Sequence, residues 1–139
     1  MKLFVLDASV AVKWFVSEEH SDVAALLLDE NFDLAIPRLF FSEFGNILWK
    51  KFTRGELSHD EVIDAARGLQ SAMLTPMDDE WLLDAAIALA CELKHPVYDC
   101  LYLALADSLE TTMVTADRKF ANKVADPARV VFVADFLKA

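Results

Sequence analysis

The sequence has little glycine, histidine or cysteine, and each shortage excludes a class of site. The three glycines (Gly45, Gly55 and Gly68) are too scattered to form either common phosphate-binding loop. The three histidines form no His-Glu-x-x-His motif and the two cysteines form no Cys-x-x-Cys pair, which argues against a structural zinc site. Chemistry in this chain must therefore come mostly from carboxylates.

Basic residues are also scarce. The chain has 13 Lys and Arg against 23 Asp and Glu, a net charge of -10 at pH 7. A general nucleic-acid-binding protein would be basic overall. The negative charge is unevenly distributed, however, because residues 38–55 carry +3 and residues 117–123 carry +2. Two short segments are thus locally basic within an acidic chain.

Long apolar runs are absent although the chain is apolar overall. Hydrophobic residues make up 55% of the sequence and the mean hydropathy is +0.30, which excludes a disordered chain. No run approaches the ~20 residues of a membrane span, and Asp7 interrupts the first apolar stretch before it resembles a signal peptide. Two unpatterned cysteines suit a reducing compartment. We expect a cytoplasmic protein without membrane contact, part of whose apolar surface is covered by another chain.

Segments with strand and helix character alternate along the sequence. Strands are predicted at residues 2–6, 34–37, 74–77, 111–115 and 130–133. Helices are predicted at residues 8–16, 20–30, 38–53, 58–72, 78–94, 98–109 and 118–124, with Trp14, Phe15 and Trp81 in the core. The alternation predicts one α/β domain over residues 1–139, with a central, mostly parallel β-sheet between α-helices.

Three aspartates lie where ligands collect in such a sheet. Asp7 closes the first strand, Asp117 follows the strand at 111–115, and Asp99 lies at the start of a helix. Ligands of open α/β sheets bind beyond the carboxyl ends of the strands. The alternative is that each aspartate only caps the helix that follows it, since Asp is a favoured N-cap.

Glu43 is harder to explain as a surface residue. It lies within the helix at 38–53, one turn from Leu39, Phe40, Asn46 and Ile47. A carboxylate on or beside an apolar stripe needs a partner if it is ionised. The alternative is a solvated position at the edge of that stripe.

The four acids share one explanation if they meet in space. Carboxylates gathered in one crevice repel one another, and a hard divalent cation relieves that repulsion. Oxygen-only ligands suit Mg²⁺ or Mn²⁺, which can activate water and stabilise a phosphoryl transition state. Other magnesium-dependent phosphoryl enzymes remain alternatives, although a haloacid-dehalogenase-type phosphatase would have aspartate where this chain has Ser9.

The order of five motifs resembles PIN-domain proteins, and especially the VapC-type toxin ribonucleases of toxin–antitoxin pairs. The motifs are Asp7-x-Ser9, Glu43 with Asn46 three residues later, and the segments 51–58, 98–106 and 115–120. The resemblance covers nearly the whole chain. It implies a PIN-like α/β/α fold and a metal-dependent endoribonuclease; a PIN-fold binding module with weak or no catalysis is the alternative.

The resemblance also implies roles for individual residues. Asp7, Glu43, Asp99 and Asp117 would be the catalytic acids and bind Mg²⁺ or Mn²⁺. Ser9, Asn46 and Thr115 would be supporting polar groups. The partners implied are an RNA substrate, a VapB-type antitoxin and a second copy of the chain.

The basic residues near these acids have two interpretations. In the first, they complement the dipole at helix ends; in the second, they contact RNA phosphates beside the acids. The candidates for phosphate contacts are Arg38, Lys50, Lys51, Arg54, Arg118 and Lys119.

Overall fold

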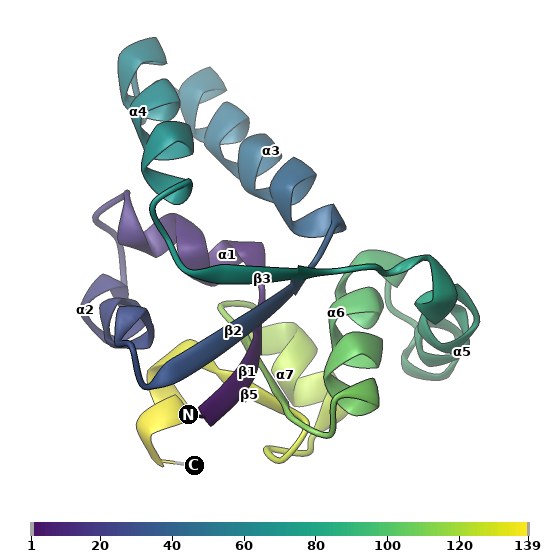
Figure 1. The fold of residues 1–139 in the computed structure, drawn as a ribbon. Helices are drawn as coiled ribbons and strands as arrows, with labels where there is room; N and C mark the ends of the chain where they lie inside the picture. The colour runs from purple at the N-terminus through teal and green to yellow at the C-terminus, as the bar shows by residue number, and fades with distance from the viewer. Residues whose placement is uncertain (1, 139) are drawn as a thin grey trace.

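Five parallel strands form one sheet in the computed structural model, which describes residues 2–138 (Figure 1). The strand order is β3-β2-β1-β4-β5, so the first strand of the chain lies in the middle. The strands are β1 (Lys2–Leu6), β2 (Phe32–Pro37), β3 (Leu74–Met77), β4 (Thr112–Thr115) and β5 (Val130–Phe132). The predicted α/β class and sheet are confirmed, and the sheet is wholly parallel.

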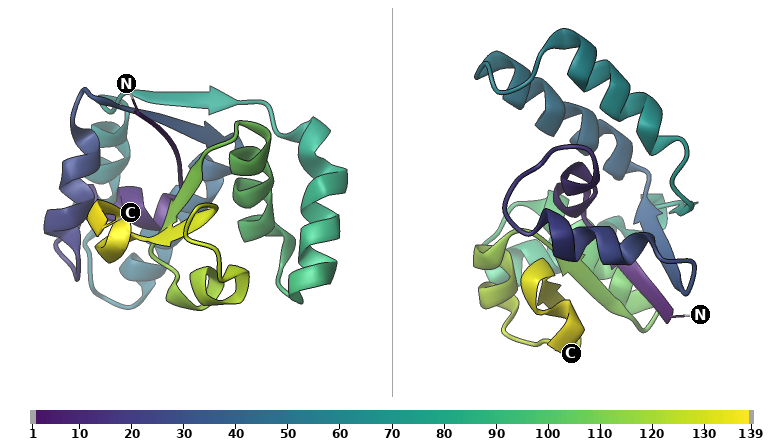
Figure 2. Two further views of the ribbon diagram at one scale, coloured as in Figure 1. Left: turned by 90° about the horizontal axis from the view of Figure 1, so that it is seen from below. Right: turned by 90° about the vertical axis from the view of Figure 1, so that its left-hand side faces the viewer.

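Helices cover both faces of the sheet. They are α1 (Ala8–Ala11), α2 (Ser21–Ala25), α3 (Leu39–Thr53), α4 (His59–Leu69), α5 (Leu83–Leu93), α6 (Val97–Ser108) and α7 (Arg118–Val124). Short 3₁₀ helices are η1 (Val12–Trp14), η2 (Leu26–Leu28), η3 (Glu80–Leu82) and η4 (Val133–Lys138). Helices α5 and α6 lie on one side of the sheet, and α1, α2 and η4 lie on the other (Figure 2). Within residues 2–138, no helix combines the length and the apolar character needed to cross a bilayer.

The register of the sheet brings distant parts of the chain to one edge. Phe4 lies opposite Leu34 of β2 and opposite Thr112 of β4. Because all strands run in the same direction, β1, β2 and β4 end at the same edge of the sheet. The residues that follow β1 and β4 are therefore neighbours although about 110 positions separate them.

Helices α3 and α4 form a hairpin that projects away from the sheet (Figure 1). Gly55 makes the turn possible because its φ of 74° lies in the left-handed region. The predicted capping box begins α4: the Ser58 side chain accepts from the Glu61 backbone N–H, and the Glu61 carboxylate accepts from the Ser58 N–H.

The prediction that Trp81 belongs to the core is wrong. Trp81 is 63% exposed, and Ala86 is the buried residue of α5. The other two aromatic predictions hold, because Trp14 and Phe15 pack against the core. Trp14 donates its indole N–H to the Ala24 carbonyl at 2.8 Å. The difference arises because η3, which carries Trp81, packs together with α5 against α6, and this packing leaves Trp81 at the surface.

Candidate active site

Asp7 follows β1 directly, and its side chain lies at the carboxyl end of the sheet. It is 6% exposed. Oδ1 accepts a hydrogen bond from the Ser9 backbone N–H at 3.4 Å, which caps α1, and Oδ2 accepts one from the Thr115 hydroxyl at 2.7 Å. Capping does not exclude a second role, because each carboxylate oxygen keeps a lone pair.

Burial raises the pKa of Asp7 to about 6. The negative charge of Asp99 contributes to the rise, and the hydrogen bonds from Thr115 and Ser9 oppose it. Asp7 is thus a buried carboxylate close to a second one, without a cation among the causes of its shift. Such a group is stabilised by any positive charge that enters the site.

Thr115 and Ser9 support the acids from behind. The Thr115 hydroxyl donates to Asp7 and accepts from the Asp117 backbone N–H at 3.1 Å. The Ser9 hydroxyl accepts from the Ala116 N–H at 3.2 Å, which ties the start of α1 to the loop after β4. Asp117 caps α7, since its Oδ1 accepts from the Phe120 N–H at 3.1 Å. These bonds fix Asp7 and Asp117 relative to each other.

Glu43 projects from α3 toward the same site, where it is half-buried. Burial raises its pKa to about 7; the nearby Tyr102 hydroxyl opposes this rise, and the charges of Asp7 and Asp99 add to it. Neither Glu43 Oε1 nor the Tyr102 hydroxyl has a hydrogen-bond partner among residues 2–138. Glu43 as a whole is half-buried where it lines the pocket, but its Oε1 is buried, so a solvated position at the edge of the apolar stripe accounts for only part of the carboxyl group.

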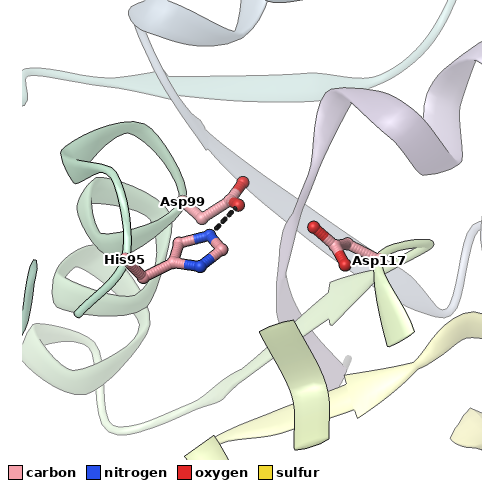
Figure 3. A group of neighbouring side chains, drawn as sticks. All are labelled: His95, Asp99 and Asp117. Atoms are coloured by element: carbon pink, nitrogen blue, oxygen red, sulfur yellow. Dashed lines mark hydrogen bonds and ion pairs between the residues drawn. The ribbon is translucent and has the colours of Figure 1, made fainter. Parts of the chain in front are cut away.

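Asp99 lies in the first turn of α6 and does not cap it. Its Oδ2 lies 2.6 Å from His95 Nε2, just before the helix (Figure 3). The carboxylate of Asp117 faces this pair, and one donor atom from each of the three residues lies within 4.8 Å of the others. His95 is not among the site residues predicted from the sequence, because it lies between two helices, where no helical spacing links it to Asp99.

One pocket brings the four acids together. Its volume is about 530 Å³, and it lies at the carboxyl edge of the sheet. The lining residues are Asp7, Ser9, Leu39, Ser42, Glu43, Asn46, Ile47, Lys50, Tyr98, Asp99 and Asp117. Of the three predicted supporting groups, Ser9 and Asn46 line the wall and Thr115 is buried behind it. Their catalytic or metal-binding roles remain predictions.

The six basic candidates differ in how they are placed. Lys50, Arg54 and Lys119 are all exposed, and of these three Lys50 lines the pocket. Arg38 pairs with Asp78 at 2.9 Å, and Lys51 pairs with Glu18 at 2.8 Å.

Arg118 is also engaged within the chain. Its guanidinium lies 3.8 Å from Asp135 and 4.0 Å from the centroid of the Phe132 ring. Among the six, Lys50 is therefore the residue already placed at the acids.

The chemistry of the pocket fits a divalent cation. The four acids supply carboxylate oxygens, which hard cations prefer. Glu43 Oε1 is buried without a partner, and the raised pKa values of Asp7 and Glu43 show that their charged forms are poorly compensated by the protein alone. A cation held by these oxygens would give Glu43 Oε1 a partner and would stabilise the charged forms of Asp7 and Glu43.

Comparison with known proteins identifies a family and a similar protein. The family model described as PIN domain matches residues 4–125. Ribonuclease VapC3 of Pyrobaculum aerophilum is 36% identical over 128 residues, covering 88% of this chain and 95% of that protein.

Solved structures agree with the match in fold. The crystal structure of PAE2754 from Pyrobaculum aerophilum is 25% identical with a TM-score of 0.73, covering 99% of this chain and 93% of that one. A toxin–antitoxin complex from Klebsiella pneumoniae contains a chain with a TM-score of 0.64 at 16% identity, covering 96% and 98%.

Proposed function

Because this chain belongs to the PIN-domain family, we propose that it is a metal-dependent endoribonuclease and the toxin of a toxin–antitoxin pair. The observation that carries the proposal is the gathering of Asp7, Glu43, Asp99 and Asp117 around one pocket. The similarity to Ribonuclease VapC3 supports RNA as the substrate. We assign the activity to a single domain, since the five strands form one sheet over one core.

The four acids would hold the ion, with Mg²⁺ or Mn²⁺ the best match for their oxygens. A divalent ion in such a site activates water and stabilises the charge that develops on a phosphoryl group. Thr115 and Ser9 would keep the carboxylates in place through the bonds described above. Asn46 and Lys50 would face the RNA strand from the α3 side of the pocket.

The antitoxin partner is proposed from the family and from a bare apolar surface. A structure with the same fold is a toxin–antitoxin complex. In this chain, Trp49 and Phe52 of α3 and Ile63 of α4 are exposed and line a groove of about 270 Å³. We propose that the antitoxin covers this groove.

The second copy would use another surface. Trp81 lies on η3 and is 63% exposed; Leu83 and Ile87 lie on α5 and are 54% and 47% exposed. We propose that this α5 face forms a homodimer, since an apolar surface of this kind is stabilised by burial against a partner. Free cysteines at 91 and 100 are consistent with a cytoplasmic location.

Cleavage of RNA by the purified chain tests the proposed activity. We expect cleavage with Mg²⁺ or Mn²⁺ that stops with excess EDTA. Asp7→Asn should cut at least about 100-fold more slowly, because loss of a ligand costs more than loss of an outer-shell partner.

Asp64→Asn is the matched control, since it makes the same charge change on the exposed side of α4 and should cut at the wild-type rate. A folded Asp7→Asn variant that cuts as fast as wild type would contradict the assignment. A wild-type protein that binds the antitoxin but cuts no RNA would instead indicate a binding module.

A further inference from the structure

His95 lies beside the four acids but belongs to none of the family motifs quoted above. Its Nε2 is 2.6 Å from Asp99 Oδ2, and its ring centroid is 4.7 Å from that of Phe120 on α7. The residue follows Lys94, which ends α5 in the left-handed conformation with a φ of 53°. His95 thus occupies the space between α6, which carries Asp99, and α7, which Asp117 caps (Figure 3).

The surroundings of the second ring nitrogen favour one tautomer of a neutral His95 ring. Nδ1 lies 3.2 Å from Lys123 Nζ, and the same ammonium group donates to the Lys94 carbonyl at 3.0 Å. Lysine has three donors and no acceptor, so Nδ1 must accept. A neutral imidazole whose Nδ1 accepts carries its proton on Nε2. In that tautomer His95 donates Nε2–H to the Asp99 carboxylate, 2.6 Å away.

These contacts favour one of two roles for His95, a metal ligand or a residue that orients one. A metal ligand needs a free nitrogen lone pair, but Nε2 carries a proton and the Nδ1 lone pair faces Lys123. His95 is thus placed to orient Asp99, the proposed metal ligand, through a hydrogen bond, and not to bind the metal ion itself. His95 lies close to Asp99 because the two residues are hydrogen-bonded through Asp99 Oδ2, and Asp117 lies nearby. Asp99 Oδ1 would then be the oxygen that binds the ion.

We propose that His95 is a positioning residue: held by Lys123 and Phe120, it fixes the Asp99 carboxylate in the orientation that binds the ion. The inference rests on the proposed metal-dependent activity and adds a residue to it. Groups that orient a metal ligand through a hydrogen bond typically contribute 10–100-fold to metal affinity or activity. Lys123 takes part although it is exposed, because it selects the tautomer.

Two substitutions of His95 separate positioning from simple filling of space. His95→Gln keeps an N–H donor at about the place of Nε2, and His95→Leu keeps bulk without a donor. Mn²⁺ binding to the metal-free protein is measured by calorimetry, and RNA cleavage at saturating Mn²⁺ is measured in parallel. We expect His95→Leu to raise the Mn²⁺ dissociation constant about 10-fold and His95→Gln to restore most of that loss. His59→Leu, on the exposed start of α4, is the matched control and should bind Mn²⁺ as wild type does.

The tautomer is tested without metal or RNA by ¹⁵N NMR of the imidazole rings. The wild-type protein should show His95 with the proton on Nε2, and Lys123→Met should lose that preference and weaken Mn²⁺ binding. This NMR measurement tests the proposal even if the His95→Leu variant fails to fold.

Three results would overturn the proposal: a wild-type proton on Nδ1, a His95→Leu variant with unchanged Mn²⁺ affinity, or direct bonding of His95 to Cd²⁺ seen as ¹⁵N–¹¹³Cd coupling. Absence of RNA cleavage by a wild type that binds Mn²⁺ would count against the proposed function alone.

Discussion

The Thr115 hydroxyl donates a 2.7 Å hydrogen bond to Asp7 Oδ2 in a fully buried contact between residues 108 positions apart. The hydroxyl oxygen of Thr115 also accepts a hydrogen bond from the Asp117 backbone N–H at 3.1 Å. One side chain at the end of β4 thereby holds two of the four acids, one from each neighbouring strand end. Thr115 is 0% exposed and touches the pocket only through these partners.

Thr115→Val should destabilise the protein by roughly 1.5–3 kcal/mol, because it leaves Asp7 Oδ2 without its donor at nearly unchanged volume. Thr115→Ser keeps the hydroxyl and should recover most of the loss. Urea unfolding monitored by circular dichroism measures the difference. Equal stability of the Val and Ser variants would show that the hydroxyl contributes nothing.

The free energy of unfolding of the metal-free protein should fall as pH rises past the ordinary pKa of Asp7. Folded Asp7 keeps its proton up to about pH 6, whereas the unfolded chain releases it near 3.8, so the folded state binds more protons between these values. The full contribution is roughly 3 kcal/mol. Asp7→Asn has no such proton and should gain stability relative to wild type across this range. Urea unfolding in EDTA at a series of pH values measures the difference, and a constant gap would contradict the raised pKa.

Metal affinity should rise with pH, because a divalent cation binds the carboxylates only after their protons leave. The pKa values of about 6 for Asp7 and about 7 for Glu43 place the rise between slightly acidic and neutral pH. In Glu43→Gln the component near pH 7 should disappear while the Asp7 component remains. Mn²⁺ titration at several pH values measures both. A Glu43→Gln profile that matches wild type would exclude Glu43 from the titration.

Much of the fold follows from local signals that the sequence displays. The segments Leu74–Met77 and Arg118–Val124 were predicted at their observed bounds, and the Ser58–Glu61 capping box begins its helix as expected. Each of these signals lies within a few residues of the element that it predicts: a short apolar run for a strand, and a capping residue for the start of a helix. The helix predicted at 78–94 instead starts with the 3₁₀ turn Glu80–Leu82, because periodicity does not separate the two kinds of turn.

The site was only partly accessible from the sequence. Strand ends and an acid beside an apolar stripe pointed to Asp7, Asp117 and Glu43. The ion pair of Lys51 with Glu18 joins residues 33 positions apart, so no local pattern reveals it. The tautomer of His95 likewise depends on Lys123, which the fold alone brings near.

Neighbouring lysines on α3 should respond differently to removal. Lys50 lines the pocket, so Lys50→Ala should weaken RNA binding and reduce the salt dependence of log K by about 0.7, with little effect on stability. Lys51 Nζ lies 2.8 Å from Glu18, so Lys51→Ala should cost on the order of 1 kcal/mol of stability instead. Fluorescence anisotropy with an RNA oligonucleotide at several salt concentrations, on catalytically inactive Asp7→Asn protein, measures the first effect. Equal RNA affinity of the Lys50→Ala and Lys51→Ala variants would contradict a specific contact of Lys50 with RNA.

The oligomeric state should depend on the α5 face. Ile87 is 47% exposed beside Trp81 and Leu83, so Ile87→Asp should convert a dimer to a monomer without loss of the folded state. Light scattering after size exclusion measures the mass. Ile63→Asp, on the α4 side of the other groove, makes the same change elsewhere and should leave the dimer intact. A monomeric wild type would exclude this interface.

The central position of β1 has a consequence for protein synthesis. A ribosome makes Asp7 first, but β1 finds its β4 neighbour only after residues 112–115 have emerged. Until then the nascent chain lacks Thr115 beneath Asp7 and lacks Asp117 altogether. If this chain cuts RNA as proposed, the nuclease therefore cannot act on the RNA around it until β4 and Asp117 have emerged from the ribosome.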